Sequence, residues 1–190
     1  MPAYPTLKNR SVTLAVTGGI AAYKSCELVR LLKKAGADVR VIMTEAAAHF
    51  VTPLTFEALC GRAVGIENLT RDMPHLAATH GACDLMIVAP ATADILGKAA
   101  HGIADNLVST AIIARAAPLA VCPAMNTRMW GNPAVQRSVK VLADDGVMIW
   151  GPQAGNLACG ETGAGRMMEP EDIVELAAAA LAPKTLTGKK

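Results

Sequence analysis

The sequence predicts one α/β domain built on a mostly parallel, doubly wound β-sheet. Its 190 residues, 52% of them apolar, suit a single domain of ordinary size. Helical segments alternate with short apolar runs, an order typical of parallel sheets joined by right-handed crossovers. The runs are continuous rather than alternating in polarity, as expected of strands buried on both faces. The predicted strands are Val12–Thr17, Val39–Thr44, Leu85–Ala89, Leu119–Val121 and Val147–Trp150.

The first two strands are separated by a helix predicted over Ala22–Ala35. Its apolar residues recur on one helical face, two lysines occupy the last turn, and Gly36 provides a stop. Capping residues before a proline, or acidic residues in the first turn, begin most of the later helices. These are predicted from Thr52-Pro53 to Gly61, over Asp105–Ala116, from Asn132-Pro133 to Gly146, and from Glu169 to about Leu181. The whole arrangement is Rossmann-like, of the flavodoxin-like type, and such sheets bind ligands beyond the carboxyl ends of their strands.

Composition and charge argue against several classes of protein. The net charge of +2 gives no reason to expect nucleic acid or an anionic membrane as a partner. Every apolar stretch is interrupted well before the roughly 20 residues of a membrane span, and the N-terminus lacks the layout of a secretory signal. The five cysteines include no CxxC pair, which favours a reducing cytoplasm over a disulfide framework. No metal site is predicted, because His75 and His80 would diverge by roughly 140° on a helix.

The loops that follow the predicted strands are rich in small and hydroxylated residues. Such residues let backbone N–H groups approach a phosphate, which a helix N-terminus also favours. The first loop is not a Walker A motif, because Tyr23 replaces its second glycine, and it lacks G-x-G-x-x-G. A mononucleotide is therefore the favoured ligand. A nicotinamide enzyme, with Glu45 as a ribose-binding acid, and a plain tight turn remain alternatives. The loops are Thr17–Ala22, Met43-Thr44, Ala89–Asp94 and Cys122–Asn126.

Five segments in order resemble the flavin-dependent cysteine decarboxylases. They read T-G-G-I-A-A-Y-K (17–24), A-P-A-T-A-D (89–94), G-I-A-D-N-L (102–107), P-A-M-N-x-x-M-W (123–130) and A-C-G-E-T-G-A-G-R-M (158–167). The resemblance covers about Ser11 to Leu181 and is strongest to the branch that acts on phosphopantothenoylcysteine in coenzyme A biosynthesis. It implies a homo-oligomer, either a homotrimer or a dodecamer made of such trimers.

The C-terminal residues 183–190 resemble the joint that precedes a ligase domain in bacterial bifunctional members of this family. The expected division is a decarboxylase domain over residues 1–182 and the start of a linker over 183–190. An ordinary basic tail is the alternative.

The resemblance implies FMN as cofactor and a small-molecule substrate, 4'-phospho-N-pantothenoylcysteine. FMN oxidises the CH2–SH group to a thioaldehyde, which provides the electron sink for loss of CO2. The resulting enethiolate takes back the hydride and a proton to give 4'-phosphopantetheine. Cys159, in a glycine-rich flap, matches the residue that supplies this proton, and His75 matches the active-site histidine. The segment from His75 to Asp84 is slightly longer than the family pattern, so His80 remains a rival.

The same matches assign the binding residues. Asn126, Asn156 and Ala158 correspond to contacts with the substrate, Asn126 with its carboxylate. Asp94 departs from the Asn of many relatives, and an acid beside a phosphate is unfavourable unless it caps the helix. Two alternatives to a decarboxylase are a flavin- or nicotinamide-dependent oxidoreductase and a non-catalytic flavoprotein subunit. The residues matched to FMN contacts are Gly19, Ile20, Ala21, Thr44, Ala91, Thr92, Ala93, Ala124 and Met125.

Overall fold

The computed structural model describes residues 6–66, 83–156, 160 and 162–182, and contains a five-stranded parallel sheet. The strand order β2-β1-β3-β4-β5 is the flavodoxin-like order, which confirms the predicted fold class. Each strand is paired in parallel with its neighbours. The strands are β1 (Ser11–Val16), β2 (Asp38–Met43), β3 (Leu85–Ala91), β4 (Leu119–Pro123) and β5 (Met148–Ile149).

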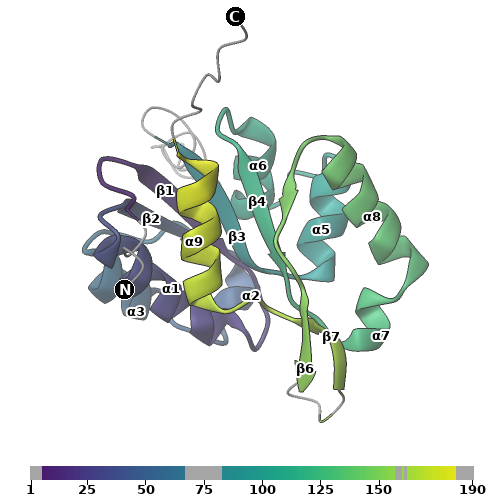
Figure 1. The fold of residues 1–190 in the computed structure, drawn as a ribbon. Helices are drawn as coiled ribbons and strands as arrows, with labels where there is room; N and C mark the ends of the chain where they lie inside the picture. Colours follow the sequence, from purple (N-terminus) through teal and green to yellow (C-terminus); the bar gives the residue numbers. More distant parts are fainter. Residues whose placement is uncertain (1–5, 67–82, 157–159, 161, 183–190) are drawn as a thin grey trace, which may run out of the picture.

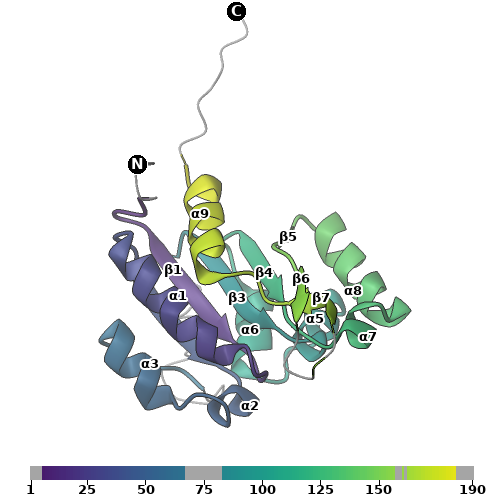
Figure 2. The same cartoon turned by 60° about the horizontal axis from the view of Figure 1, so that its bottom comes forward.

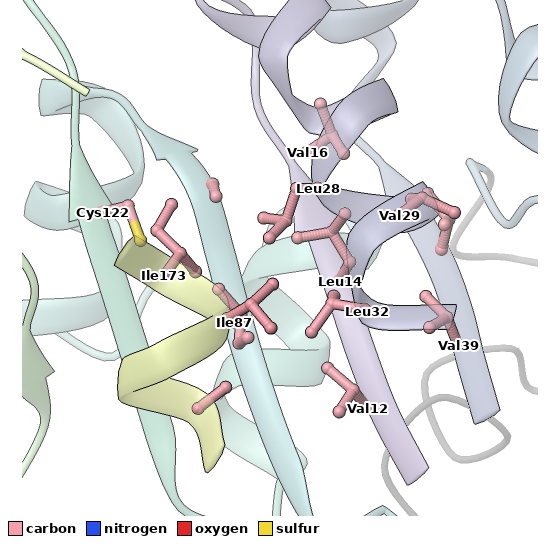
Figure 3. Close-up of a cluster of buried hydrophobic side chains, with 14 of the residues drawn as sticks. Val12, Leu14, Val16, Leu28, Val29, Leu32, Val39, Ile87, Cys122 and Ile173 are labelled. Atoms are coloured by element: carbon pink, nitrogen blue, oxygen red, sulfur yellow. The ribbon is translucent and has the colours of Figure 1, made fainter. Parts of the chain in front are cut away.

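Helices cover both faces of the sheet (Figures 1 and 2). Side chains alternate across each strand, so Leu14 packs in one apolar cluster and Ala15 in the other. Figure 3 shows the first cluster, where Leu28, Leu32 and Ile173 meet alternate residues of the strands. This face carries α1 (Ala22–Lys34), α3 (Pro53–Cys60) and α9 (Pro170–Ala180), and the other carries α5 (Ala93–Ala100), α6 (Leu107–Ala114) and α8 (Pro133–Asp144).

Some helices begin at residues other than those predicted, and the capping geometry explains the differences. The helix expected from Asp105 begins only at Leu107, because Asn106 is extended and its side chain accepts the Ser109 N–H at 3.0 Å in a capping box. Thr52 precedes α3 but makes no side-chain cap bond, whereas Asn132 caps α8 as expected. Gly61 ends α3 in the left-handed conformation at φ +81°.

The glycine-rich segment before α9 forms a separate antiparallel hairpin from β6 (Gln153–Asn156) and β7 (Thr162–Arg166). It lies beside α7 (Thr127–Trp130), near the carboxyl ends of the central strands (Figure 1). The short helix α2 (Glu45–Ala48) follows β2. None of the helices in the described ranges has the length and apolar character needed to cross a membrane.

Candidate functional site

A cleft of about 980 Å³ opens beyond the carboxyl ends of β1 and β3. The strand order reverses between these two strands, and doubly wound sheets bind their ligands at such a switch point. The volume lies within the roughly 300–1,000 Å³ of ordinary ligand pockets. The cleft is lined by the β1–α1 turn, the starts of α2 and α5, the loop before α7, and the end of β7.

The β1–α1 turn is held in place by hydrogen bonds of the buried Thr17 side chain. Thr17 Oγ1 donates to the carbonyl oxygen of Pro90 at 2.6 Å and accepts the N–H of Thr92 at 3.2 Å. These bonds tie the end of β1 to the end of β3. Glycine is required at position 18 because the turn packs closely against α2: a Cβ on Gly18 would lie 2.5 Å from the Cβ of Ala46. The turn therefore presents its backbone to the cleft in a fixed position.

The start of α1 is suited to an anion. Its N-cap residue is Ala21, which makes no side-chain cap bond, and its first turn contains no acidic residue. The first N–H groups of a helix carry partial positive charge, and in α1 those of Ala22 and Lys24 already donate to the carbonyl oxygens of Gly19 and Ala21 at 2.9 Å and 3.0 Å. By contrast, Thr44 and Thr92 cap α2 and α5 by accepting backbone N–H groups at 3.2 Å and 3.4 Å. A phosphate at the start of α1 would fit this arrangement.

Acidic residues on the α5 side of the cleft are paired with a lysine. Lys98 Nζ lies 3.1 Å from a carboxylate oxygen of Asp94 and 3.1 Å from one of Asp105. The hydrogen bond from Lys98 is the main cause that lowers the pKa of Asp105. Asp94 therefore lies in the cleft without capping α5, and Lys98 offsets its charge.

The loop before α7 is packed against the hairpin. Ala124 N–H donates to the Ala91 carbonyl at 3.0 Å, and Met125 N–H donates to the Gly165 carbonyl at 2.9 Å. Asn126 Oδ1 accepts the N–H of Arg128 at 2.7 Å, which fixes the orientation of its amide. A Cβ on Gly165 would lie only 2.2 Å from the carbonyl oxygen of Met125. Glycine at this position lets β7 close against the loop.

A second group of ion pairs joins three elements at the opposite side of the cleft. Lys24 of α1 donates to both carboxylate oxygens of Glu169, at 3.0 Å and 2.9 Å, and Arg166 of β7 also donates to Glu169. Lys24 and Arg166 line the cleft, whereas Glu169 precedes α9. The hydrogen bond from Lys24 is the main cause that lowers the pKa of Glu169, so its carboxylate stays ionised.

Comparison with known families agrees with this geometry. The sequence profile of the Flavoprotein family matches residues 2–182. The chain belongs to this family. The flavoprotein is 49% identical over 183 residues to the coenzyme A biosynthesis bifunctional protein CoaBC of Bacillus subtilis (strain 168), an alignment that covers 94% of this chain and 45% of that protein. It is 48% identical to CoaBC of Escherichia coli (strain K12), again over 94% and 45%. It thus spans about half the length of these relatives.

Solved structures share the fold of the flavoprotein. A PPC decarboxylase mutant complexed with pantothenoylaminoethenethiol is 30% identical, with a TM-score of 0.80 over 90% of this chain and 98% of that chain. The FMN-dependent cysteine decarboxylase SpaF is 28% identical, with a TM-score of 0.77 over 92% and 99%. The FMN binding protein AtHal3 is 31% identical, with a TM-score of 0.77 over 90% and 96%.

The cleft of the flavoprotein brings together most of the residues that the sequence singled out. Ala91 is the exception among the described cofactor residues, because it is fully buried in β3 and does not line the cleft. Asn156 ends β6. His75, His80, Ala158 and Cys159 lie outside the described residues. The predicted residues that line the cleft are Gly19, Ile20, Ala21, Thr44, Thr92, Ala93, Ala124, Met125 and Asn126.

Sequence reasoning missed the charged lining of the cleft. Four charged residues for which the sequence analysis predicts no role line the cleft: Lys24, Lys98, Asp105 and Arg166. Lys24, Asp105 and Arg166 lie inside segments that carry the family resemblance, T-G-G-I-A-A-Y-K, G-I-A-D-N-L and A-C-G-E-T-G-A-G-R-M. The presence of charged residues inside these segments is the sequence signal that could have identified them as lining the cleft.

Proposed function

We propose that this chain decarboxylates 4'-phospho-N-pantothenoylcysteine to 4'-phosphopantetheine in coenzyme A biosynthesis, with FMN as its cofactor. The observation that carries the proposal is the cleft at the β1/β3 switch point, where the loops matched to flavin and substrate contacts meet. The relatives named CoaBC and the PPC decarboxylase fold support the same activity. A reaction with net electron transfer is less favoured, since these relatives are named for coenzyme A biosynthesis.

The described residues fit FMN and its substrate in distinct places. The start of α1, which has no side-chain cap, would hold the flavin phosphate together with Gly19, Ile20 and Ala21. Ala124 and Met125 would lie against the flavin, and the oriented amide of Asn126 would bind the carboxylate of the substrate. When bound, FMN supplies the oxidation of the CH2–SH group that makes loss of CO2 feasible. Closure of the hairpin against the Met125 loop would exclude water.

Two proton-transfer roles complete the proposal. Cys159, which lies between β6 and β7 in the sequence, would protonate the enethiolate, since a thiol can act as a general acid. His75 would act as the base or hold the carboxylate, with His80 as the rival. Cys159→Ser should still bind flavin and release CO2 but stall before the final product. Full product formation by this variant would remove Cys159 from the mechanism, and a fully active His75→Asn would favour His80.

The assembly is proposed to be a cytoplasmic homotrimer or a dodecamer made of such trimers. Ile20 and Tyr23 leave 60% and 61% of their surface exposed at the edge of the cleft, which suits burial by a second copy. The described cysteines are all free, in keeping with a reducing compartment. A ligase domain after a linker over residues 183–190 is proposed because the chain spans about half of the CoaBC relatives. Light scattering of the purified domain tests the assembly, and a monomer at micromolar concentration would contradict it.

One experiment tests the proposed decarboxylase activity directly. The purified domain is saturated with FMN, its visible absorption is recorded, and CO2 release from phosphopantothenoylcysteine is measured without any external electron acceptor. Catalytic turnover with no net flavin reduction supports the proposal. A protein that binds no flavin, or that consumes an acceptor stoichiometrically, overturns it.

A further inference from the structure

The charges that line the cleft are unevenly distributed. On the α5 side, one ammonium group, Lys98, faces two carboxylates, Asp94 and Asp105. On the α1 side, Lys24 and Arg166 share the single carboxylate of Glu169. In this cluster of described residues two cations therefore share one carboxylate, and a further acid, Glu45 at the start of α2, also lines the cleft. A guanidinium that shares its carboxylate with a second cation can still attract an anionic group of a ligand.

Arg166 is built into this position rather than free on the surface. The register of the hairpin shifts so that Gly165, at φ +144°, is an extra residue on β7, and bulges of this kind redirect the neighbouring side chain. A Cβ on Gly155 would lie 3.3 Å from Arg166 Nη1 and 3.4 Å from its Cδ. The absence of a side chain at Gly155 thus leaves room for the guanidinium. Arg166 still exposes 43% of its side chain, compared with 11% for Lys24.

The proposed ligands bring three anionic groups into the cleft. The flavin phosphate has a partner in the start of α1, and the substrate carboxylate has one in Asn126. Asn126 caps α7, whereas the guanidinium of Arg166 lies with Lys24 of α1 and Glu169 before α9. The remaining anionic group is the phosphate of the substrate, and the remaining cationic group is the Lys24–Arg166 pair.

We propose that Arg166, supported by Lys24 and held by Glu169, binds the phosphomonoester of the substrate and makes the enzyme prefer phosphorylated over unphosphorylated ligands. This inference rests on the proposed function. A guanidinium suits this task because it can donate two parallel hydrogen bonds to phosphate oxygens and remains charged at all relevant pH values. Arg166 acts here in binding and takes no part in proton transfer.

The test compares the binding of the product and its dephosphorylated form to the FMN-loaded domain. Calorimetry at pH 8, where the phosphate is dianionic, gives the ratio of the two affinities, 4'-phosphopantetheine over pantetheine. Charge-assisted hydrogen bonds to the phosphate should make this ratio about 10 to 100 in the parent protein. Arg166→Gln should bring it close to 1, and Arg166→Lys should keep an intermediate preference. The control is Arg137→Gln on the exposed side of α8, which should retain the parent ratio.

A second set of measurements tests whether Arg166 binds the phosphate of the cofactor instead of that of the substrate. The affinities of each variant for FMN and riboflavin are compared by fluorescence quenching, with thermal unfolding as a check on the fold. If Arg166→Gln weakens FMN but not riboflavin, the arginine serves the cofactor phosphate and the proposal is wrong. An unchanged product ratio in Arg166→Gln, or no preference in the parent, also overturns it. Failure of the parent to release CO2 would count against the proposed function alone, because the binding ratio is measured without turnover.

Discussion

Replacing Gly165 with alanine tests the close approach of the hairpin to the loop that precedes α7. The new Cβ would begin 2.2 Å from the carbonyl oxygen of Met125, at a backbone φ of +144° that side chains rarely adopt. Such a backbone conformation costs about 1–3 kcal/mol for a residue other than glycine. Overpacking of a closely fitted contact costs about 1–3 kcal/mol more. Because the hairpin can partly relax away from the loop, we expect the free energy of unfolding to fall by about 2–4 kcal/mol.

Gly97 provides the matched control, because it lies inside α5 and a Cβ there would meet no atom within 4 Å. Gly97→Ala should raise the free energy of unfolding by about 0.5–1 kcal/mol, through loss of backbone freedom in the unfolded chain. Urea unfolding at equal flavin saturation measures both variants. For a domain of this size, the loss in Gly165→Ala corresponds to a melting temperature lowered by roughly 5–15 °C. A Gly165→Ala protein within about 0.5 kcal/mol of the parent would refute the close approach.

Three further perturbations have defined outcomes. Asn106→Ala removes the capping box of α6 and should cost about 1 kcal/mol in urea unfolding, whereas an unchanged midpoint would contradict the cap. Lys98→Met leaves the carboxylates of Asp94 and Asp105 beside the cleft without their cation. Their negative charge should repel the phosphate of FMN, so the variant should bind FMN more weakly than the parent, most clearly at low salt. Equal FMN affinities of variant and parent at all salt concentrations would contradict this. The pKa of Glu169 is lower in the folded state than the ordinary Glu pKa of about 4.3. Its ionised carboxylate therefore stabilises the fold at pH values above about 4.3, and this stabilisation is lost as the pH falls through the folded-state pKa. Glu169→Gln should therefore be less stable than the parent at pH 7 and approach it at acid pH, and a constant difference between the two melting curves would contradict this sign.

Much of the fold could be predicted because it depends on local sequence. The apolar run of β1 and the amphipathic pattern of α1, ended by Gly36, are properties of short segments, and the structure confirms both. The helix that the sequence predicts from Asp105 begins two residues later, at Leu107, because Asn106 and Ser109 form a capping box that depends on their geometry. Helix α5 was not predicted at all, although small residues at its start were singled out for the cleft.

The candidate site, too, could be predicted from the sequence only in part. The sequence alone determined which loops carry small residues and hydroxyls, because these follow apolar strands whose order along the chain can be read directly. The sequence also predicts Ala91 as a cofactor contact, which stays a prediction: this residue is fully buried in β3, where it pairs with Pro123 of β4, and is not among the described residues that line the cleft.

Only the tertiary structure decided which charges meet. Lys24 and Glu169 are 145 residues apart, and no local pattern predicts that they form an ion pair. Their contact depends on the strand order and on the packing of α1 beside α9, which are set by long-range burial of apolar surface. The sequence thus determined the residue types around the cleft, and the packing of distant elements determined that Lys24 and Arg166 share the carboxylate of Glu169 beside it.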